Sequence, residues 1–195
     1  MALAFLASLR GYKQREYVLF IPLLALSFSV EMLRHLYPKL ESTLRFFVAV
    51  EYAFLALIIS NFIHSRKKRL VIQSSIFVIV PVLIFIQWKI VNRSPAYQYL
   101  DVMIESPFVC VWTILYLFET IKQEQEFEVT KNPMFWISLG NLLFFSGSFF
   151  SYGFGSYLAF KGSAMAQTIY GIARVLNILL YILYFIGFLC LKKKR

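Results

Sequence analysis

Four ionisable residues lie inside long apolar stretches of the chain: Glu31, Glu51, Glu105 and Arg174. An ionisable side chain near the centre of a bilayer costs roughly 2.5–3.5 kcal/mol on insertion scales, so such residues mark functional sites or buried ion pairs. At a rise of about 1.5 Å per residue, Glu51, Glu105 and Arg174 lie about 12 Å below the same membrane surface, and Glu31 is shallower. We therefore expect these four side chains to meet in one layer.

The last apolar stretch adds a row of polar and aromatic residues. Spacings of three and four residues place them on one helical face. They are Gln167, Tyr170, Arg174, Asn177, Tyr181 and Tyr184. We expect this face to point into the protein interior.

A second polar row precedes Glu105. Tyr97, Asp101 and Glu105 recur every fourth residue, and Pro107 follows them. Proline removes a helical hydrogen bond, so we expect a bend next to the acids, and a second bend at Pro81 in the preceding stretch.

Two interpretations of these polar residues stay open, and they are compatible. In the first, Arg174 forms a buried ion pair with Glu51 or Glu105. In the second, an outward-facing polar cavity binds a small ligand or a proton, with Arg174 as the contact for an anion and the glutamates as polar or titrating partners. The candidate site residues are Glu31, Glu51, Asp101, Glu105, Gln167, Tyr170, Arg174 and Asn177.

The residue types argue against several other classes of site. The two histidines, His35 and His64, lie near opposite ends of their apolar stretches, so we expect no metal centre within one chain. Cys110 and Cys190 both lie in apolar stretches and are expected to be buried thiols. No hydrolase, metalloprotease or phosphate-binding motif occurs, so we expect no cofactor and no catalytic residue.

The elements that must position these residues follow from composition. Of the 195 residues, 59% are hydrophobic and 15% are charged, whereas soluble domains have about 45–50% apolar and about 25% charged residues. Unbroken apolar runs of about 20 residues predict an all-α, polytopic transmembrane bundle of about six spans that forms a single membrane domain. The spans are expected at about 17–36, 43–64, 70–91, 97–119, 133–153 and 166–190.

The distribution of Lys and Arg predicts the orientation. The flanks on the side of both termini hold 13 of these residues and the opposite flanks hold 6. Because short basic loops stay in the cytoplasm, we expect a multi-pass protein of the bacterial inner membrane with a cytoplasmic C-terminus. The basic clusters Arg66–Arg69 and Lys192–Arg195 then contact anionic lipid. The net charge of +10 is explained this way, and we expect no nucleic-acid partner.

The N-terminal segment Met1–Leu9 is apolar but short. Its positive charges follow the apolar residues, which is the wrong order for a secretory signal peptide. It is either the remnant of a seventh helix whose beginning is cut off or a short interfacial segment.

Two further features bear on contacts. Gly147, Ser151 and Gly155 form a row of small residues that lets another helix approach closely, either within the chain or in a homodimer. The acidic segment between Glu119 and Pro133 is either a solvated connector or a docking surface for a soluble partner.

Several short motifs resemble those of an uncharacterised group of small bacterial inner-membrane proteins with six or seven helices. They are the Glu31 and Glu51 positions, Glu105-Ser106, Asn132-Pro133-x-Phe135-Trp136-Ile137-Ser138-x-Gly140 and Phe145-Ser146-Gly147. Some members are encoded beside sensor histidine kinases, so the resemblance implies a signalling partner of that kind.

The function expected from these features is a non-enzymatic sensory or signal-transfer module in the membrane. Its polar site would change the packing of the helices and so alter the cytoplasmic loops. A small transporter or channel subunit is the alternative, and an intramembrane enzyme is the third interpretation.

Overall fold

The computed structural model describes residues 1–9, 14, 16–37, 44–91, 97, 99–123, 129–162 and 164–191. Within these residues the chain forms seven α-helices and one π-helix, and no strand. They are α1 (Ala2–Ser8), α2 (Phe20–Leu36), α4 (Phe47–Phe62), α5 (Arg66–Ile86), the π-helix η3 (Gln87–Val91), α6 (Leu100–Gln123), α8 (Pro133–Phe160) and α9 (Met165–Leu189).

Four of these helices are long and apolar enough to cross a membrane. They cover Arg66–Ile90, Leu100–Lys122, Pro133–Phe160 and Met165–Leu189, and α4 is a shorter apolar helix of 16 residues. The all-helical architecture is therefore confirmed, and the long apolar helices are typical of a transmembrane protein.

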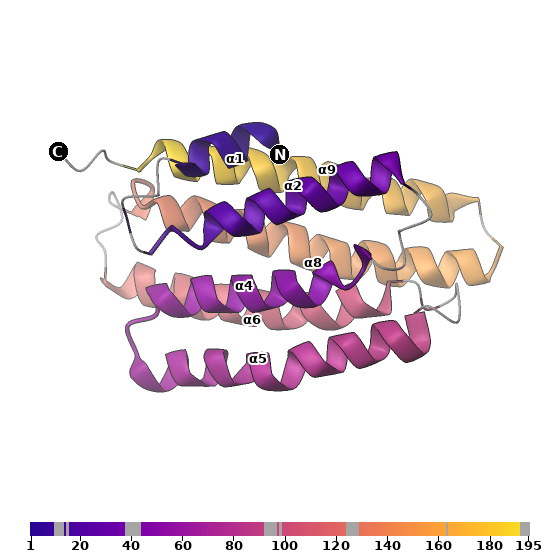
Figure 1. Ribbon diagram of the computed structural model, residues 1–195, viewed down its shortest axis with the longest axis horizontal. Coiled ribbons are helices and arrows are strands. Elements are labelled where there is room, and N and C mark those ends of the chain that lie inside the picture. The colour runs from indigo at the N-terminus through magenta and orange to yellow at the C-terminus, as the bar shows by residue number, and fades with distance from the viewer. Residues whose placement is uncertain are drawn as a thin grey trace.

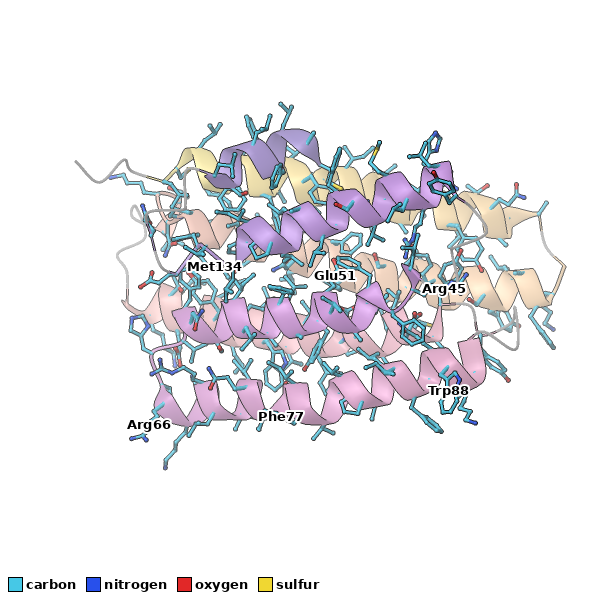
Figure 2. All side chains as sticks on the ribbon, in the orientation of Figure 1. Arg45, Glu51, Arg66, Phe77, Trp88 and Met134 are labelled. Atoms are coloured by element: carbon cyan, nitrogen blue, oxygen red, sulfur yellow. The ribbon has the colours of Figure 1, made fainter. Side chains whose placement is uncertain are left out.

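The long helices lie side by side in a bundle (Figure 1). Helix α8 packs on α9 and α6, while α4 packs on α5, α6 and α2. The short helix α1 lies against α9 and α2. Figure 2 shows Arg66 and Met134 at one end of the bundle, here named the Arg66 end, and Arg45 and Trp88 at the other, the Arg45 end.

The outer surface of the bundle is apolar along its length. Phe77 is 83% exposed halfway along α5 (Figure 2), and Phe150 and Ile178 also face outward. Such a surface would be costly in water, whereas acyl chains solvate it without penalty. The exposed side chains therefore fit a lipid environment.

Helices α8 and α9 approach closely because glycines of α8 face α9. A Cβ atom at Gly147 would overlap the side chain of Leu176, and one at Gly155 would overlap the ring of Tyr170. Ser151, between the two glycines, is buried. The small-residue row thus serves packing inside the chain.

The helix that carries this row is longer than the sequence predicted. Helix α8 begins at Pro133, capped by the Asn132 side chain, and continues to Phe160, seven residues beyond the expected end at 153. The packing of Gly155 on Tyr170 keeps this segment helical. Gly162, with a φ of +69°, then turns the chain toward α9.

At the Arg66 end a salt bridge joins α5 to α6. The Lys68 Nζ donates to the Glu119 carboxylate at 2.7 Å, and the His64 backbone N–H donates to the same carboxylate at 3.1 Å. Two predicted features, the basic cluster Lys192–Arg195 and the acidic residues at 124–128, lie outside the described residues.

Candidate ligand-binding cavity

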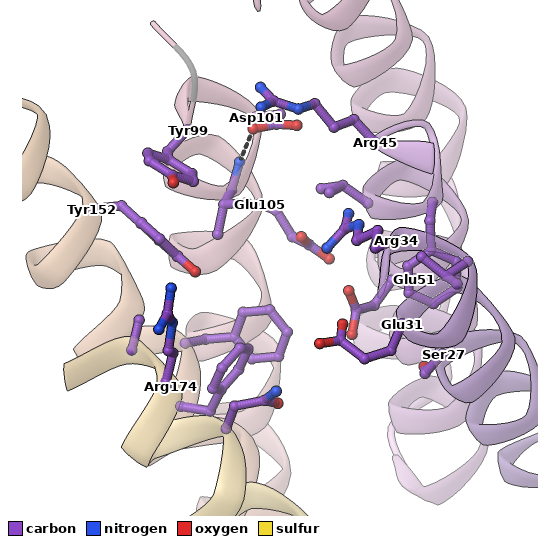
Figure 3. A pocket seen from close by; sticks show the side chains of 18 of the residues that line it. Ser27, Glu31, Arg34, Arg45, Glu51, Tyr99, Asp101, Glu105, Tyr152 and Arg174 are labelled. Carbon is purple, nitrogen blue, oxygen red and sulfur yellow. Dashed lines mark hydrogen bonds between the residues drawn. The ribbon is translucent and has the colours of Figure 1, made fainter. Parts of the chain in front are cut away.

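A polar cavity of about 330 Å³ lies among five helices, α2, α4, α6, α8 and α9 (Figure 3). Arg45 lines it, so the cavity reaches toward the Arg45 end of the bundle. Six residues of the predicted site line it. They are Glu31, Glu51, Asp101, Glu105, Arg174 and Asn177. Polar residues from separate apolar stretches, which the sequence predicts to lie in one layer, therefore surround one cavity.

Helical spacing places each group on the cavity wall. On α2, Ser27, Glu31 and Arg34 follow one another at four and three residues and share one face. On α6, Asp101 and Glu105 are one turn apart. The side chains of α2 and α4 thus point at those of α6 (Figure 3).

Asp101 is buried and has several partners. Its carboxylate accepts hydrogen bonds from Gln87 Nε2 at 3.1 Å and from the Val102 backbone N–H at 2.9 Å. Gln87 belongs to the π-helix and also donates to the Arg45 carbonyl at 2.6 Å. The Arg45 guanidinium lies beside Asp101 (Figure 3) and attracts it electrostatically. The charge of Asp101 is therefore balanced at the cavity edge.

Glu105 is one helical turn deeper in the cavity and is not balanced by hydrogen-bond partners as Asp101 is. It is 1% exposed, and its Oε1 is buried without a hydrogen-bond partner. Across the cavity lie Glu51 and Arg34 (Figure 3), and Arg34 attracts Glu51 electrostatically. The Arg34 Nε is itself buried without a hydrogen-bond partner. The cavity thus contains one unpaired acceptor and one unpaired donor.

The predicted ion pair of Arg174 with Glu51 or Glu105 is wrong. Among the described residues no carboxylate oxygen lies within 4.0 Å of the Arg174 guanidinium. Arg174 instead points toward Tyr152 of α8 (Figure 3). Helix α9 packs on α8, so the cavity separates Arg174 from the acids of α4 and α6.

Two other predicted site residues are not part of the cavity lining. Gln167 is exposed near the start of α9. The Tyr170 ring lies 5.0 Å, centroid to centroid, from that of Tyr99, and Tyr99 stacks on Tyr152 at 4.3 Å. The polar row of α9 therefore enters the cavity only from Arg174 onward.

Below the cavity, toward the Arg66 end, the bundle is filled. The Tyr184 hydroxyl donates to Asn141 Oδ1 at 2.5 Å, and Trp112 Nε1 donates to the Tyr52 hydroxyl at 3.2 Å. Large, fully buried side chains continue each wall. They are Phe20, Leu24, Leu55, Ile58, Phe145 and Phe188.

Sequence reasoning missed four residues of the cavity wall: Arg34, Arg45, Tyr99 and Tyr152. Arg34 and Arg45 are two of the six basic residues that the orientation prediction assigns to the opposite flanks. Arg34 had a usable signal, because it follows Glu31 by three residues and so shares its helical face.

The cavity does not resemble a metal centre. Within the described part of the chain, no three His, Cys, Asp or Glu side chains are grouped so that they could hold a metal ion. The acids supply hydrogen-bond acceptors and the arginines supply donors to the cavity.

The fold and the cavity together define a class: an all-helical protein with long apolar helices and a buried polar cavity between them. Comparisons with protein-family models, with curated proteins and with solved structures found no match.

Proposed function

We propose that the chain is a non-enzymatic sensory or signal-transfer module of the bacterial inner membrane, and that its cavity binds a small, positively charged ligand. In this proposal α2 and α4 cross the membrane together with the four longer helices, which gives six spans. The Arg45 end faces outward and the C-terminus lies in the cytoplasm, because the excess of Lys and Arg is on that side.

The observation that carries the proposal is the unpaired Glu105 carboxylate. A buried acceptor without a hydrogen bond costs about 1–3 kcal/mol, and more if it is charged. The cavity wall contains four acids, namely Glu31, Glu51, Asp101 and Glu105, and three arginines. Met1, whose α-amino group is a further cation, also lines the cavity, so the formal charges of the wall balance. Glu105 itself has a buried oxygen without a hydrogen-bond partner, and a ligand cation beside it would supply that partner.

A primary ammonium group fits this site best. It carries three N–H donors and one positive charge. Glu105 and Glu51 face each other across the cavity (Figure 3), so one ammonium group between them would satisfy acceptors on both sides. In the absence of ligand, a proton shared by the two glutamates has the same effect on the charge.

The filled lower half of the bundle favours binding over passage. A transporter or channel would need polar groups that continue from the cavity to the Arg66 end. Below the cavity, the described side chains on the walls are mainly apolar and fully buried, and the hydroxyls of Tyr184 and Tyr52 are already hydrogen-bonded to protein partners. Asn141 accepts from Tyr184, although its Nδ2 is buried without a partner.

Helix α6 is the element that would carry a signal. It holds Glu105 in the cavity wall and Glu119 in the salt bridge with Lys68 at the Arg66 end. A ligand that draws Glu105 toward Glu51 would change how α6 packs on α4, and this shift would reach the salt bridge. A cytoplasmic or membrane partner, such as a histidine kinase, would read the change there.

The test uses the purified protein in nanodiscs and butylammonium as the probe. At ten times its Kd, butylammonium should stabilise the wild type by about 1.4 kcal/mol in thermal unfolding. Glu105→Gln and Glu51→Gln each remove a charged hydrogen-bond acceptor, so each should weaken butylammonium binding by about tenfold or more.

Glu119→Gln is the matched control, because it makes the same change in the same helix but outside the cavity. Its butylammonium affinity should change by much less than that of Glu105→Gln, because Glu119 acts on the cavity only through the packing of α6. Equal affinities in Glu105→Gln, Glu51→Gln and the wild type would refute the proposed site.

A further inference from the structure

A second cavity, of about 510 Å³, adjoins the polar one and is mostly apolar. It lies between α2 and α9, with α1 across it. Its apolar lining comes from all three helices. The residues are Met1, Leu3, Ala4, Phe28, Met32, Ile178, Ile182 and Phe185. We name this space the α2/α9 groove.

The groove and the polar cavity meet. Met1, Glu31, Asn177 and Tyr181 line both of them. A molecule that fills the two spaces therefore has a polar end among the acids and an apolar part between α2 and α9.

The groove also faces the outside of the bundle. Ile178 is 63% exposed and Met32 is 46% exposed, on opposite walls of the groove. Nearer the Arg66 end, the two helices are joined by the Phe20 ring, which packs edge to face on Tyr184 and Phe188. The gap between α2 and α9 is thus closed at the Arg66 end and opens sideways above it, where acyl chains would surround the bundle.

We propose that the ligand is a single-chain amphiphile with an ammonium headgroup, which enters the site from the lipid through the α2/α9 groove. This inference rests on the proposed function and names the class of its ligand. The ammonium group lies between Glu51 and Glu105, and the alkyl chain lies along Met32 and Ile182.

Charge decides between this ligand and an ordinary zwitterionic phospholipid. Glu105 has a buried oxygen without a partner and faces Glu51 across the cavity. A simple ammonium headgroup would place one cation between these two acids. A zwitterionic headgroup would bring a phosphate as well, which the two carboxylates repel.

The test compares two amines with the same headgroup, butylammonium and dodecylammonium, in nanodiscs of phosphatidylcholine. Ile182→Trp fills the groove, and Ile172→Trp is its matched control. Both isoleucines are on α9, and they are 49% and 48% exposed, but Ile172 lines neither cavity. The affinity of each amine is measured from the shift in the thermal unfolding midpoint.

We expect Ile182→Trp to weaken dodecylammonium binding by about tenfold, because overfilling a packed site costs a few kcal/mol at most. Its affinity for butylammonium should stay within about twofold of the wild type, since the butyl chain is much shorter than the dodecyl chain and fills little of the groove. Ile172→Trp should leave both affinities unchanged. If Ile182→Trp does not fold, Met32→Trp fills the groove from its other wall.

Each other outcome is decisive. If Ile182→Trp and Ile172→Trp bind dodecylammonium equally well while butylammonium still binds, the groove plays no part, and the amphiphile is rejected while the proposed function stands. If neither amine stabilises the wild type, the proposed function fails and this inference fails with it.

Discussion

The buried charges of the cavity differ in how well they are satisfied. Asp101 accepts hydrogen bonds from Gln87 and Val102 and lies beside Arg45. Glu105, one turn further along α6, has a buried oxygen with no partner. Two acids with nearly equal burial on one helical face therefore differ in their need for a ligand. In the proposed function, this difference places the charged group of the ligand at Glu105, between α6 and α4.

Arg34 has the complementary role. Its Nε is buried without a hydrogen-bond partner, and it attracts Glu51. An arginine in this place offsets the negative charge of the glutamates around it. Because Arg34 and Glu31 are both on α2, any movement of that helix shifts a cation and an acid together.

The sequence could predict which acids approach one another but not which partners they have. The depth of Glu51, Glu105 and Arg174 within their apolar stretches predicts that they share one layer, and all three line the cavity. The pairing of Arg174 depends on which helices are neighbours, and this order cannot be read from hydropathy. Arg34 was missed because it lies near a helix end, where a basic residue is normally an orientation signal.

At the scale of the elements, apolar run length predicted the long helices well. The helix ends were predicted less well. The apolar run of α8 ends at about residue 153, whereas the helix itself ends at Phe160. The helix continues beyond the apolar run because its backbone hydrogen bonds and its packing on α9 also continue. A span boundary in a sequence marks where lipid ends, and a helix is free to extend beyond it.

The contact between α8 and α9 can be tested with two glycines. A Cβ atom at Gly187 would lie 2.8 Å from the Pro133 carbonyl oxygen at the start of α8, whereas one at Gly171 has nothing within 4 Å. Gly187→Ala should therefore lower the free energy of unfolding by about 1–3 kcal/mol. Gly171→Ala, in the middle of α9, should raise it by up to about 1 kcal/mol, because alanine favours the helix.

Unfolding of both glycine variants in a detergent titration measures the difference. A loss of stability in Gly171→Ala equal to that in Gly187→Ala would mean that α9 does not pack closely on α8 at Gly187.

At the scale of the whole molecule, the bundle is asymmetric along its length. Acids and arginines gather in the cavity near the Arg45 end, and the Lys68–Glu119 salt bridge lies at the Arg66 end. The apolar middle separates them. This layout suits a protein that binds on one side of the membrane and responds on the other.

The orientation is a prediction that single cysteines can test. In a background with Cys110→Ala and Cys190→Ala, we expect Lys161→Cys to react with a membrane-impermeant maleimide in intact cells. Lys67→Cys should react only after the cells are made permeable, because the two positions lie at opposite ends of the bundle. Labelling of both from the same side would contradict the proposed arrangement.

The central claim is that the cavity selects a positive charge although three arginines line it. The most direct measurement compares butylammonium, 1-butanol and butyrate on the wild-type protein in nanodiscs. These probes share a short alkyl chain and differ in the charge of the end group. We predict that butylammonium alone raises the unfolding midpoint in a saturable way. A larger rise with butyrate would show that the arginines select the ligand, and it would contradict the claim.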